Sequence, residues 1–353
     1  MKHIINHSRF KKRFSQKESE RLLGNSKKII KFPLYDKNYY IFFNNYAKNN
    51  YKLVDNNCLC KTENDVLLSL TDRHCINFLT VVCKNCGLIR AKYYFREKDV
   101  NDFYKNYYRT ESYSNNKLIP PKEMFDKQKS ESQFRFDLIN KYRIKQLNNL
   151  KIIDLGGGIG GVLDHFNDSN QKYLFDFYDP YLEFAETKGI KSIKGGLDKI
   201  DFKPDIIILS HVIEHWNNFE YEIQKLINVQ KKNETLNYIE FPGVDSLKKG
   251  RREGDILGDI HVPHVYYFTS YVFENLMNRY GFEKIYIDTR IKSIFIYTGK
   301  IGNLVNHYEL CYKDLIAAEK TRKFQIFKNL IKKYMPMFII KIFRKIKKRK
   351  FVY

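Results

Sequence analysis

A glycine-rich segment follows an apolar run that ends in an acid, in the stretch KIIDLGGGIGG over residues 151–161. Asp154 closes the apolar run, and Gly156, Gly158 and Gly160 come directly after it. Glycine lets the backbone turn sharply and approach a ligand at positions where a Cβ atom would collide. The segment therefore predicts a buried strand that runs into a tight, ligand-binding turn at the start of a helix.

Two later segments repeat the pattern of a strand followed by residues that can do chemistry. One apolar stretch ends in Asp179, and a carboxylate at such a strand end can accept hydrogen bonds from both hydroxyls of a ribose. The other, over residues 205–210, is followed by His211, Glu214 and His215. In an open α/β sheet, ligands bind beyond the carboxyl ends of the strands. We therefore expect these side chains to face one pocket.

The three ordered motifs together resemble the class I S-adenosylmethionine-dependent methyltransferases over about residues 125–300. The resemblance implies S-adenosyl-L-methionine as cofactor, with an acid that holds the ribose and residues after the third strand beside the adenine. The cofactor-binding residues implied in this way are Asp154, Gly156, Gly158, Gly160, Asp179, Leu197, Asp198 and His211. The alternative is a nucleotide-binding oxidoreductase, which would more often carry its glycine motif near the start of its domain.

Histidines supply the candidates for a catalytic base. An oxygen or carbon acceptor must lose a proton, and histidine is the natural base near neutral pH. His215 follows the fourth predicted strand, and His261 and His264 follow the fifth. The alternative for the Glu214–His215 pair is a structural role at a helix entrance. A zinc site built from the histidines is disfavoured, because the spacing of His261 and His264 suits no helical face.

Cysteines form a second constellation, upstream of the glycine segment. Two short pairs, Cys58 with Cys60 and Cys83 with Cys86, are separated by a spacing typical of a tetrahedral zinc site. His74 and Cys75 are the substitute ligands if one pair does not bind. Four thiolates leave no open coordination position, so this zinc is expected to be structural. Disulfides are disfavoured in a cytoplasmic chain.

The order of these parts narrows the resemblance. The cysteine module, the aromatic stretch over residues 103–109 and the methyltransferase-like core follow one another as in bacterial methyltransferases encoded with surface-polysaccharide enzymes. The resemblance implies a sugar or nucleotide-sugar acceptor. Sugar C-methyltransferases share an N-terminal zinc domain, but their additional C-terminal domain is not identifiable here. The choice between O- and C-methylation therefore stays open.

Basic residues dominate the chain, with 63 Lys and Arg against 40 Asp and Glu and a formal net charge of +23. Such a charge favours polyanionic partners. Residues 321–353 contain 12 Lys or Arg and no acid, interleaved with apolar residues that begin at Phe324. A basic amphipathic helix of this kind favours an anionic membrane surface, and RNA is the alternative. No signal-peptide pattern and no membrane-spanning apolar run is found, so we expect a cytoplasmic protein that can reach the inner face of the membrane.

The sequence as a whole predicts an α/β fold with a Rossmann-like, seven-stranded, mainly parallel sheet and helices on both faces. A small zinc-ribbon-like module precedes the sheet and a basic helical tail follows it. The expected parts are an extension (1–50), the zinc module (51–110), a linker with a cofactor-covering helix (111–148), the core (149–300) and the tail (301–353). A basic tip at residues 248–252 is expected to hold a nucleotide-sugar diphosphate, or else to be a solvated loop.

Two other functions remain open from the sequence. One is an RNA methyltransferase that uses the zinc module and the basic tail to hold phosphates, although no Asn/Asp-Pro-Pro-Tyr-type motif follows the fourth strand. The other is a non-catalytic zinc-ribbon binding protein. The sequence gives no indication of the oligomeric state.

Overall fold

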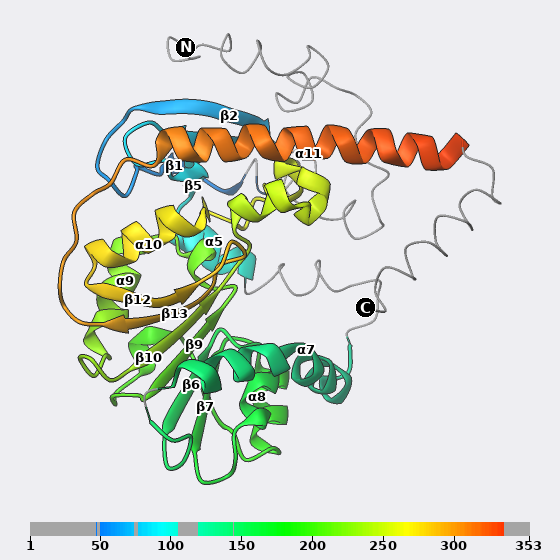
Figure 1. The fold of residues 1–353 in the computed structure, drawn as a ribbon. Helices are drawn as coiled ribbons and strands as arrows, with labels where there is room; N and C mark the ends of the chain where they lie inside the picture. Colours follow the sequence, from blue (N-terminus) through cyan, green and yellow to red (C-terminus); the bar gives the residue numbers. More distant parts are fainter. Residues whose placement is uncertain (1–46, 48–49, 74–76, 105–118, 144, 335–353) are drawn as a thin grey trace.

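The computed structural model describes residues 47, 50–73, 77–104, 119–143 and 145–334 (Figure 1). Nearly all of the predicted N-terminal extension lies outside these residues, as do His74, Cys75, most of the linker and the last part of the basic tail. Within the described part of the chain, no helix combines the length and the apolar character needed to cross a bilayer.

A seven-stranded sheet forms the centre of the molecule, in the order β12-β13-β10-β9-β6-β7-β8. The five parallel strands are β6 (Lys151–Leu155), β7 (Gln171–Asp176), β8 (Lys191–Lys194), β9 (Ile206–Ser210) and β10 (Leu236–Glu240). The hairpin of β12 (Phe282–Ile287) and β13 (Lys292–Tyr297) adds two antiparallel strands. This confirms the predicted fold class. The chain leaves β6 for β7 and β8 on one side and returns to β9 on the other, so the strand order reverses between β6 and β9.

Each face of this sheet has its own apolar core. Along β9, Ile206 and Ile208 pack in one cluster and Ile207 and Leu209 in the other. Successive side chains of a strand point to opposite faces, so a continuous apolar run is what a strand covered on both sides requires. This explains why the central strands read as uninterrupted runs of Ile and Leu.

The helices around the sheet are α7 (Pro121–Tyr142), α8 (Asp179–Glu186), α9 (Phe219–Asn228) and α10 (Ser270–Arg279). Two local predictions were wrong. The helix expected directly after the glycine turn is only a short 3₁₀ turn, η3 (Gly161–His165). The apolar stretch expected to end in Asp179 forms a strand only as far as Asp176, and Asp179 is the first residue of α8.

The cysteine module is built from short strands that join the core directly. Its sheet has the order β11-β4-β3-β2, with β2 (Asp65–Thr71), β3 (Asn77–Cys83) and β4 (Ile89–Ala91) from the module. The fourth strand, β11 (Tyr266–Tyr267), belongs to the connection that follows β10. A separate pair, β1 (Leu53–Asp55) with β5 (Tyr93–Phe95), leads into α5 (Glu97–Phe103). The module and one face of the central sheet share one apolar cluster.

The connection after β10 is largely structured. Its 3₁₀ turns are η6 (Val244–Lys249), η7 (Arg251–Gly254) and η8 (Ile256–Gly258), whereas η4 (Leu197–Lys199) and η5 (Ile213–His215) lie earlier in the chain, after β8 and β9. Helix α11 (Tyr308–Tyr334) lies across the turns η6, η7 and η8 (Figure 1). The first half of α11 buries Cys311, Leu315 and Ala318 against them. The predicted tail is therefore docked on the body over its first four turns.

Candidate active site

The glycine loop after β6 has the conformation that its sequence predicts. Gly156, Gly158 and Gly160 have φ angles of +64°, +65° and +76°, in the left-handed region that other residues rarely adopt. A Cβ atom at Gly156 would lie 2.9 Å from Val212 Cγ2, and one at Gly158 would lie 2.7 Å from Gln128 Nε2. The loop is thus held closely between the β9 side of the sheet and helix α7. Glycine is required here both for the left-handed φ angles and because neighbouring side chains leave no room for a Cβ atom.

Asp176 at the tip of β7 holds this loop in place. Its Oδ2 atom accepts a hydrogen bond of 2.8 Å from the Gly158 N–H, and Oδ1 accepts bonds from the N–H groups of Phe177 and Tyr178. The carboxylate is only 4% exposed. The carbonyl oxygen of Asp176 also accepts a bond of 3.0 Å from the Gly195 N–H, beyond β8. The tips of β6, β7 and β8 are therefore tied together by one residue.

Asp154 is buried beneath the loop. Its carboxylate occupies the space beside Gly157, where a Cβ atom would lie 2.1 Å from Oδ2. Burial raises the pKa of Asp154 to about 7; the charge of Arg135 opposes this rise and that of Asp176 adds to it. Arg135 of α7 in turn makes a two-pronged ion pair with Glu240 at the tip of β10 (2.9 and 3.3 Å). Helix α7 is thereby fixed across the strand ends.

The other predicted cofactor residues lie on the same edge of the sheet, in different surroundings. Leu197 is buried and belongs to the core cluster that contains residues of β6 and β7. Asp198 is exposed. Asp179 is also exposed and pairs with Lys194 at 2.7 Å. Asp176, not Asp179, is the acid at the strand tip, so the predicted ribose contact of Asp179 has a second candidate three residues earlier.

The four predicted histidines lie close together beyond β9 and β10. Residue His211 directly follows β9 with a φ of +58°, and its Nδ1 lies 3.2 Å from Oε1 of Glu214. The rings of His215 and His264 meet edge to face with centroids 4.7 Å apart, and those of His261 and His264 are 5.2 Å apart. The two histidine segments, distant in sequence, therefore form one cluster.

Side chains of the surrounding loops hold these rings. Nδ1 of His215 lies 2.9 Å from the carbonyl oxygen of Pro263 and 2.9 Å from the hydroxyl of Tyr104. The hydroxyl of Tyr267 donates to the carbonyl oxygens of His261 and His264 at 3.1 Å each, which fixes the turn between them. The contact of Tyr104 with His215 could not be predicted from the sequence, because the two residues are more than a hundred positions apart.

The cluster divides into rings of different basicity. Burial lowers the pKa of His215, and it lowers the pKa of His264 well below 6.5, with nearby positive charges that include Arg73 and Arg252 adding to the effect. For His211, burial also acts downward, but the hydrogen bond and the charge of Glu214 outweigh it and raise the pKa. Neutral rings at His215 and His264 have a lone pair with which to accept a proton or bind a cation.

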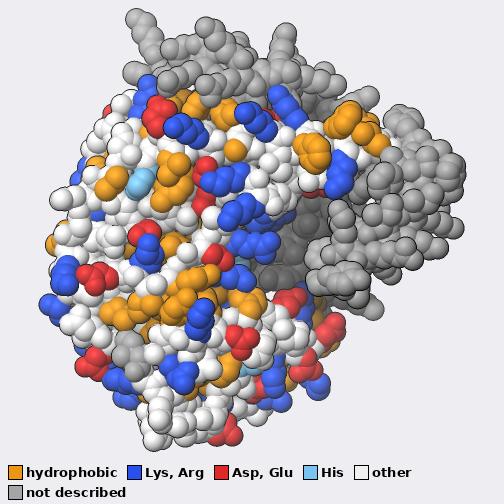
Figure 2. All heavy atoms as spheres, viewed as in Figure 1, with side chains coloured by type: hydrophobic (Ala, Val, Ile, Leu, Met, Phe, Trp, Pro, Cys, Tyr) orange, Lys and Arg blue, Asp and Glu red, His pale blue; other side chains and the backbone are white. Residues whose placement is uncertain are grey.

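The basic tip at residues 248–252 is only partly available to a ligand. Lys248 forms an ion pair with Asp314 of α11 (2.7 Å), and Arg251 forms a two-pronged pair with Asp259. Arg252 is half exposed and lies 3.4 Å from Asp259. Figure 2 shows Lys and Arg side chains gathered on this face between α11 and the sheet. Lys248 and Arg251 therefore anchor the loop through ion pairs, and Arg252 remains half exposed, where a ligand can reach it.

The four predicted cysteine ligands come together in one buried group. Sγ of Cys58 lies 3.4 Å from that of Cys60 and 3.5 Å from that of Cys86, and Cys60 lies 3.5 Å from Cys83. Four sulfur atoms at such separations fit the corners of a tetrahedron around one zinc ion with Zn–S bonds of about 2.3 Å. Gly87 has a φ of +82°, as the knuckle after the second pair requires.

Other groups of the module suit a site of thiolates. Hydrogen bonds from the neighbouring thiols, from the Thr62 hydroxyl and from the Asn85 N–H lower the pKa of Cys83. The guanidinium of Arg90 is fully buried, pairs with Asp65 at 2.8 and 2.9 Å, and interacts electrostatically with Cys58 and Cys83. A buried cation next to the sulfur atoms offsets the negative charge that four thiolates would bring.

The cysteine module directly supports the histidine segment. The Ala91 N–H donates to the carbonyl oxygen of Val265, and the Tyr94 hydroxyl donates to that of Pro263. The pairing of β4 with β11 continues these contacts. The position of His264 therefore depends on the module as well as on the central sheet.

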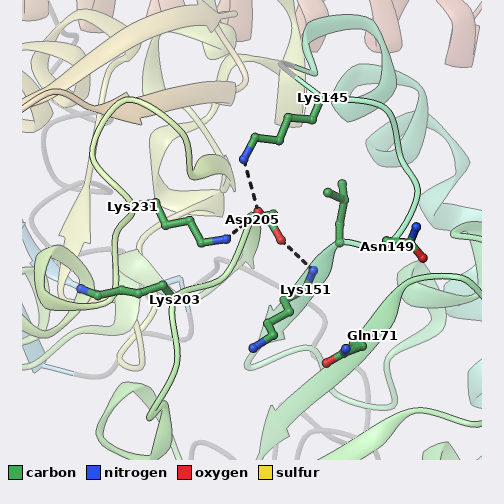
Figure 3. A pocket seen from close by; sticks show the side chains of 8 residues that line it. Lys145, Asn149, Lys151, Gln171, Lys203, Asp205 and Lys231 are labelled. Atoms are coloured by element: carbon green, nitrogen blue, oxygen red, sulfur yellow. Dashed lines mark hydrogen bonds and ion pairs between the residues drawn. The ribbon is translucent and has the colours of Figure 1, made fainter.

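A basic hollow lies at the opposite, amino-terminal ends of the strands (Figure 3). Its lysines surround Asp205, which pairs with Lys231 at 2.7 Å and with Lys145 at 3.8 Å and accepts a bond from the Lys151 N–H. These contacts join the starts of β6 and β9 to the loop before β10. The hollow is far from the glycine loop, so we assign it a structural role.

Comparison with protein-family models found a match over residues 119–287, to the family described as "Methyltransferase domain". The match begins just before α7 and ends at the last residue of β12, and so contains the glycine loop and the histidine cluster. This chain therefore carries the domain of an S-adenosylmethionine-dependent methyltransferase. A search of curated proteins found no match.

Several solved structures resemble the chain at low sequence identity. A S-adenosylmethionine-dependent methyltransferase from Aquifex aeolicus is 14% identical, with a TM-score of 0.35 over 51% of this chain and 96% of that one. The magnesium protoporphyrin IX methyltransferase of Synechocystis, solved with bound S-adenosylhomocysteine, is 16% identical, with a TM-score of 0.37 over 57% and 97%. The YcgJ protein of Bacillus subtilis gives 16% identity and a TM-score of 0.33 over 43% and 70%.

The glycines leave space at the methyltransferase site in which a cofactor fits. The left-handed loop, closed over by Gln128 of α7 and tied to Asp176, forms a cradle that any side chain at Gly158 would enter. Gln128 and Asp176 are functional candidates that sequence reasoning missed. Asp176 could have been identified from the sequence, because it ends the run of strand-forming residues. Gln128 could not, because it lies on a helical face that no sequence motif marks.

Proposed function

We propose that this methyltransferase acts on a sugar or nucleotide-sugar in surface-glycan biosynthesis, by O- or C-methylation. The observation that carries the proposal is the cluster of His211, His215, His261 and His264 beyond the β9 and β10 ends of the sheet. The cluster provides bases for a hydroxyl or an acidic carbon, next to arginines that suit an anionic acceptor.

The bound cofactor supplies a methyl group that its sulfonium already activates, so the protein has chiefly to align donor and acceptor. Asp176 and Gln128 hold the loop that receives the donor, and Asp154, Asp179, Leu197 and Asp198 lie along the same sheet edge. One imidazole of His215, His261 and His264 takes the acceptor's proton. The closely packed rings then exclude water from the point of transfer.

The charge near the cluster favours a diphosphate on the acceptor. Arg73 and Arg252 are close enough to His264 to lower its pKa, and the Arg252 side chain is half exposed. Guanidinium groups bind phosphate oxygens in a two-pronged manner. A sugar carried by a nucleoside diphosphate would meet these groups while its ring faces the histidines.

Zinc in the four-cysteine group belongs to the same proposal. The sulfur separations and the buried Arg90 support a structural zinc ion that Cys58, Cys60, Cys83 and Cys86 would hold. With all four positions taken by thiolates, this ion would have no part in the reaction. Its contribution would be to fix the module that supports the His261–His264 turn.

We also propose that α11 binds an anionic membrane surface, where lipid-linked glycan precursors are assembled. Its second half exposes a series of apolar side chains: Phe324, Ile326, Phe327, Leu330 and Ile331. Exposed lysines accompany them, including Lys320, Lys323 and Lys328. Apolar side chains with basic neighbours on one helix suit insertion at the interface of an anionic bilayer.

Turnover measured against two panels of acceptors tests the proposal. We expect methyl transfer from labelled S-adenosylmethionine to at least one nucleotide-sugar, and at least a 10-fold loss of kcat/KM in Arg252→Gln. Transfer to bulk RNA with none to nucleotide-sugars would replace the proposal with the RNA alternative. Calorimetry with the cofactor alone provides the control: cofactor binding without turnover on either panel rejects both acceptors but retains the enzyme class.

A further inference from the structure

We infer that Glu214, His215 and His264 form a second metal site, for one divalent cation, on the acceptor side of the methyltransferase pocket. The binding of the cation does not depend on which acceptor is methylated. Only the role of the cation in methyl transfer rests on the proposed function. The sequence disfavours a metal site at the histidines, because the spacing of His261 and His264 suits no helical face. The structure brings the ligands from two separate loops instead.

The three side chains converge at a distance that one cation can bridge. One ligand atom from each residue lies within 4.8 Å of the other two. Oε1 of Glu214 is 3.9 Å from Nε2 of His215, and the rings of His215 and His264 are in edge-to-face contact. Bonds of about 2.0–2.2 Å to one ion place ligand atoms some 3–3.5 Å apart. Small side-chain rotations therefore suffice to complete the site.

The hydrogen bond of His215 presents the correct nitrogen. A carbonyl oxygen can only accept, so the contact of 2.9 Å with Pro263 places the ring proton on Nδ1. In the neutral ring, Nε2 then carries the lone pair, and this is the atom that faces Glu214. A backbone carbonyl bound to the far nitrogen is the usual arrangement behind a metal-ligating histidine.

Glu214 has an incomplete environment that a cation would complete. The side chain is only 2% exposed, and its Oε1 atom contacts His211. Its Oε2 atom is buried and makes no hydrogen bond to any residue that the structure describes. A buried carboxylate oxygen without a hydrogen-bond partner destabilises the fold, because it has lost its hydration and gained nothing in return. A cation beside it removes this cost, whereas the contact with His211 alone leaves it in place.

The ligand set selects a cation different from that of the cysteine group. Two imidazoles and a carboxylate suit divalent first-row metals and leave coordination positions open, whereas four thiolates suit zinc and leave none. Mn²⁺ prefers oxygen and nitrogen over thiolate, so it distinguishes the two sites. The chain would thus carry one closed structural site and one open site.

The open site has a role in transfer to a hydroxyl acceptor. A cation at the cluster lowers the pKa of a hydroxyl that binds it. The hydroxyl proton passes to a base, for which His261, whose ring packs against that of His264, is the candidate. The new oxygen–carbon bond then forms as the carbon–sulfur bond breaks, and the electron pair of that bond returns to sulfur as a neutral thioether. His215 and His264 would act as ligands in this scheme, and not as bases.

Titration of the full chain with Mn²⁺, followed by the electron paramagnetic resonance of the free ion, tests the site. The protein is first treated with a chelator that leaves the cysteine-bound zinc in place, as checked by elemental analysis. We expect one Mn²⁺ bound per chain, and at least a 10-fold weaker affinity in Glu214→Gln and in His264→Ala. The matched controls are Glu222→Gln on α9 and His307→Gln, which lie outside the cluster and should bind Mn²⁺ like the unmodified protein.

Glu214→Gln separates a metal site from a structural role. The substitution keeps the shape of the side chain and removes a buried charge, so without a metal it should leave the fold as stable as before or more so. No Mn²⁺ bound by the unmodified chain, or equal affinity in Glu214→Gln and Glu222→Gln, would overturn the inference. If the metal site is overturned but the protein still binds the cofactor and transfers methyl groups, the proposed function stands. If the protein binds Mn²⁺ but does not methylate nucleotide-sugars, only the proposed function is rejected.

Discussion

Two buried acids at the strand tips, Asp154 and Asp176, lie against the glycine loop. Asp154 and Asp176 lie next to one another below the glycine turn, and both are almost fully buried. Asp176 receives three backbone N–H bonds, whereas for Asp154 the desolvation of the charge dominates and raises the pKa to about 7. A carboxyl group with a raised pKa favours its neutral form in the folded protein, so the charged form reduces stability.

Asp154→Asn should make the protein more stable than the unmodified chain at pH 8, and the difference should shrink towards pH 4. The unfolded carboxyl ionises near 3.9, but the folded one only near 7, so the unmodified protein loses stability progressively as the pH rises between these values. The full effect is at most about 4 kcal/mol. Urea unfolding at several pH values measures it.

The exposed Asp168 provides the control for this series. Its carboxylate lies at the surface in a pair with Lys172, so Asp168→Asn should give a difference in unfolding free energy that changes little with pH. An Asp154→Asn variant whose advantage stays flat from pH 4 to pH 8 would show that Asp154 is not held neutral in the fold.

Gly158→Ala should weaken the binding of S-adenosylmethionine at least 10-fold. The substitution forces alanine into a φ of +65° and places its Cβ 2.7 Å from Gln128 Nε2, at the cradle between the loop and α7. The left-handed conformation itself costs about 1–2 kcal/mol in stability. Calorimetric titration with the cofactor measures the affinity, and thermal unfolding measures the stability.

Gly189→Ala is the matched control, since Gly189 has a φ of +73° and no atom within 4 Å of an added Cβ. Its loss of stability should resemble that of Gly158→Ala, and its affinity for the cofactor should be unchanged. Equal affinities in the two variants would remove the glycine loop from the cofactor site.

The elements of the core were predictable because each strand is buried on both faces. The strand before the glycine loop and the strand before His211 lie where the sequence predicted them, and Gly156, Gly158 and Gly160 adopt the left-handed turn that the sequence indicated. The turn after the loop was predicted as a helix, but five residues form only a 3₁₀ turn there. Contacts such as Tyr104 with His215 could not be predicted, since they depend on how distant loops pack.

Helix α11 divides into a docked half and an exposed half, which the pattern of its sequence did not separate. Cys311, Leu315 and Ala318 are buried against the turns after β10, and Lys248 pairs with Asp314. From Phe324 to Ile331 the apolar side chains are exposed. A helix held at one end and apolar at the other is suited to attach the whole body to a surface.

The double substitution Phe324→Ser with Phe327→Ser should reduce binding to vesicles of phosphatidylglycerol and phosphatidylcholine at least 10-fold. Burial of a phenylalanine side chain contributes about 1.5–3 kcal/mol, and both rings are more than half exposed in the structure. Co-sedimentation measures the binding. Ile301→Ser is the control, because Ile301 is an exposed apolar residue outside the helix; an equal effect of the two changes would exclude α11 as the membrane contact.

At the scale of the whole molecule, the cysteine module and the methyltransferase core are one folded unit. Their side chains share an apolar cluster, and β11 of the core completes the sheet of the module. The carbonyl oxygens of Pro263 and Val265 accept hydrogen bonds from the module. The glycine loop, by contrast, takes its support from α7 and β7. Loss of the module should therefore affect the acceptor side more than the cofactor side.

Cys83→Ser should abolish the zinc binding that we propose for the four-cysteine group, lower the unfolding temperature and reduce methyl transfer at least 10-fold, while the affinity for S-adenosylmethionine changes much less. The reason is that the sulfur of Cys83 belongs to the group behind β3 and β4, whose partner strand carries the turn of His264. Elemental analysis, calorimetry and turnover are compared with Cys311→Ser, a buried cysteine of α11 outside the group. That control loses stability but keeps its zinc, so it separates a general loss of stability from loss of the metal. Cofactor affinity that falls in parallel with turnover in Cys83→Ser would show that the module supports the entire pocket, and not the acceptor side in particular.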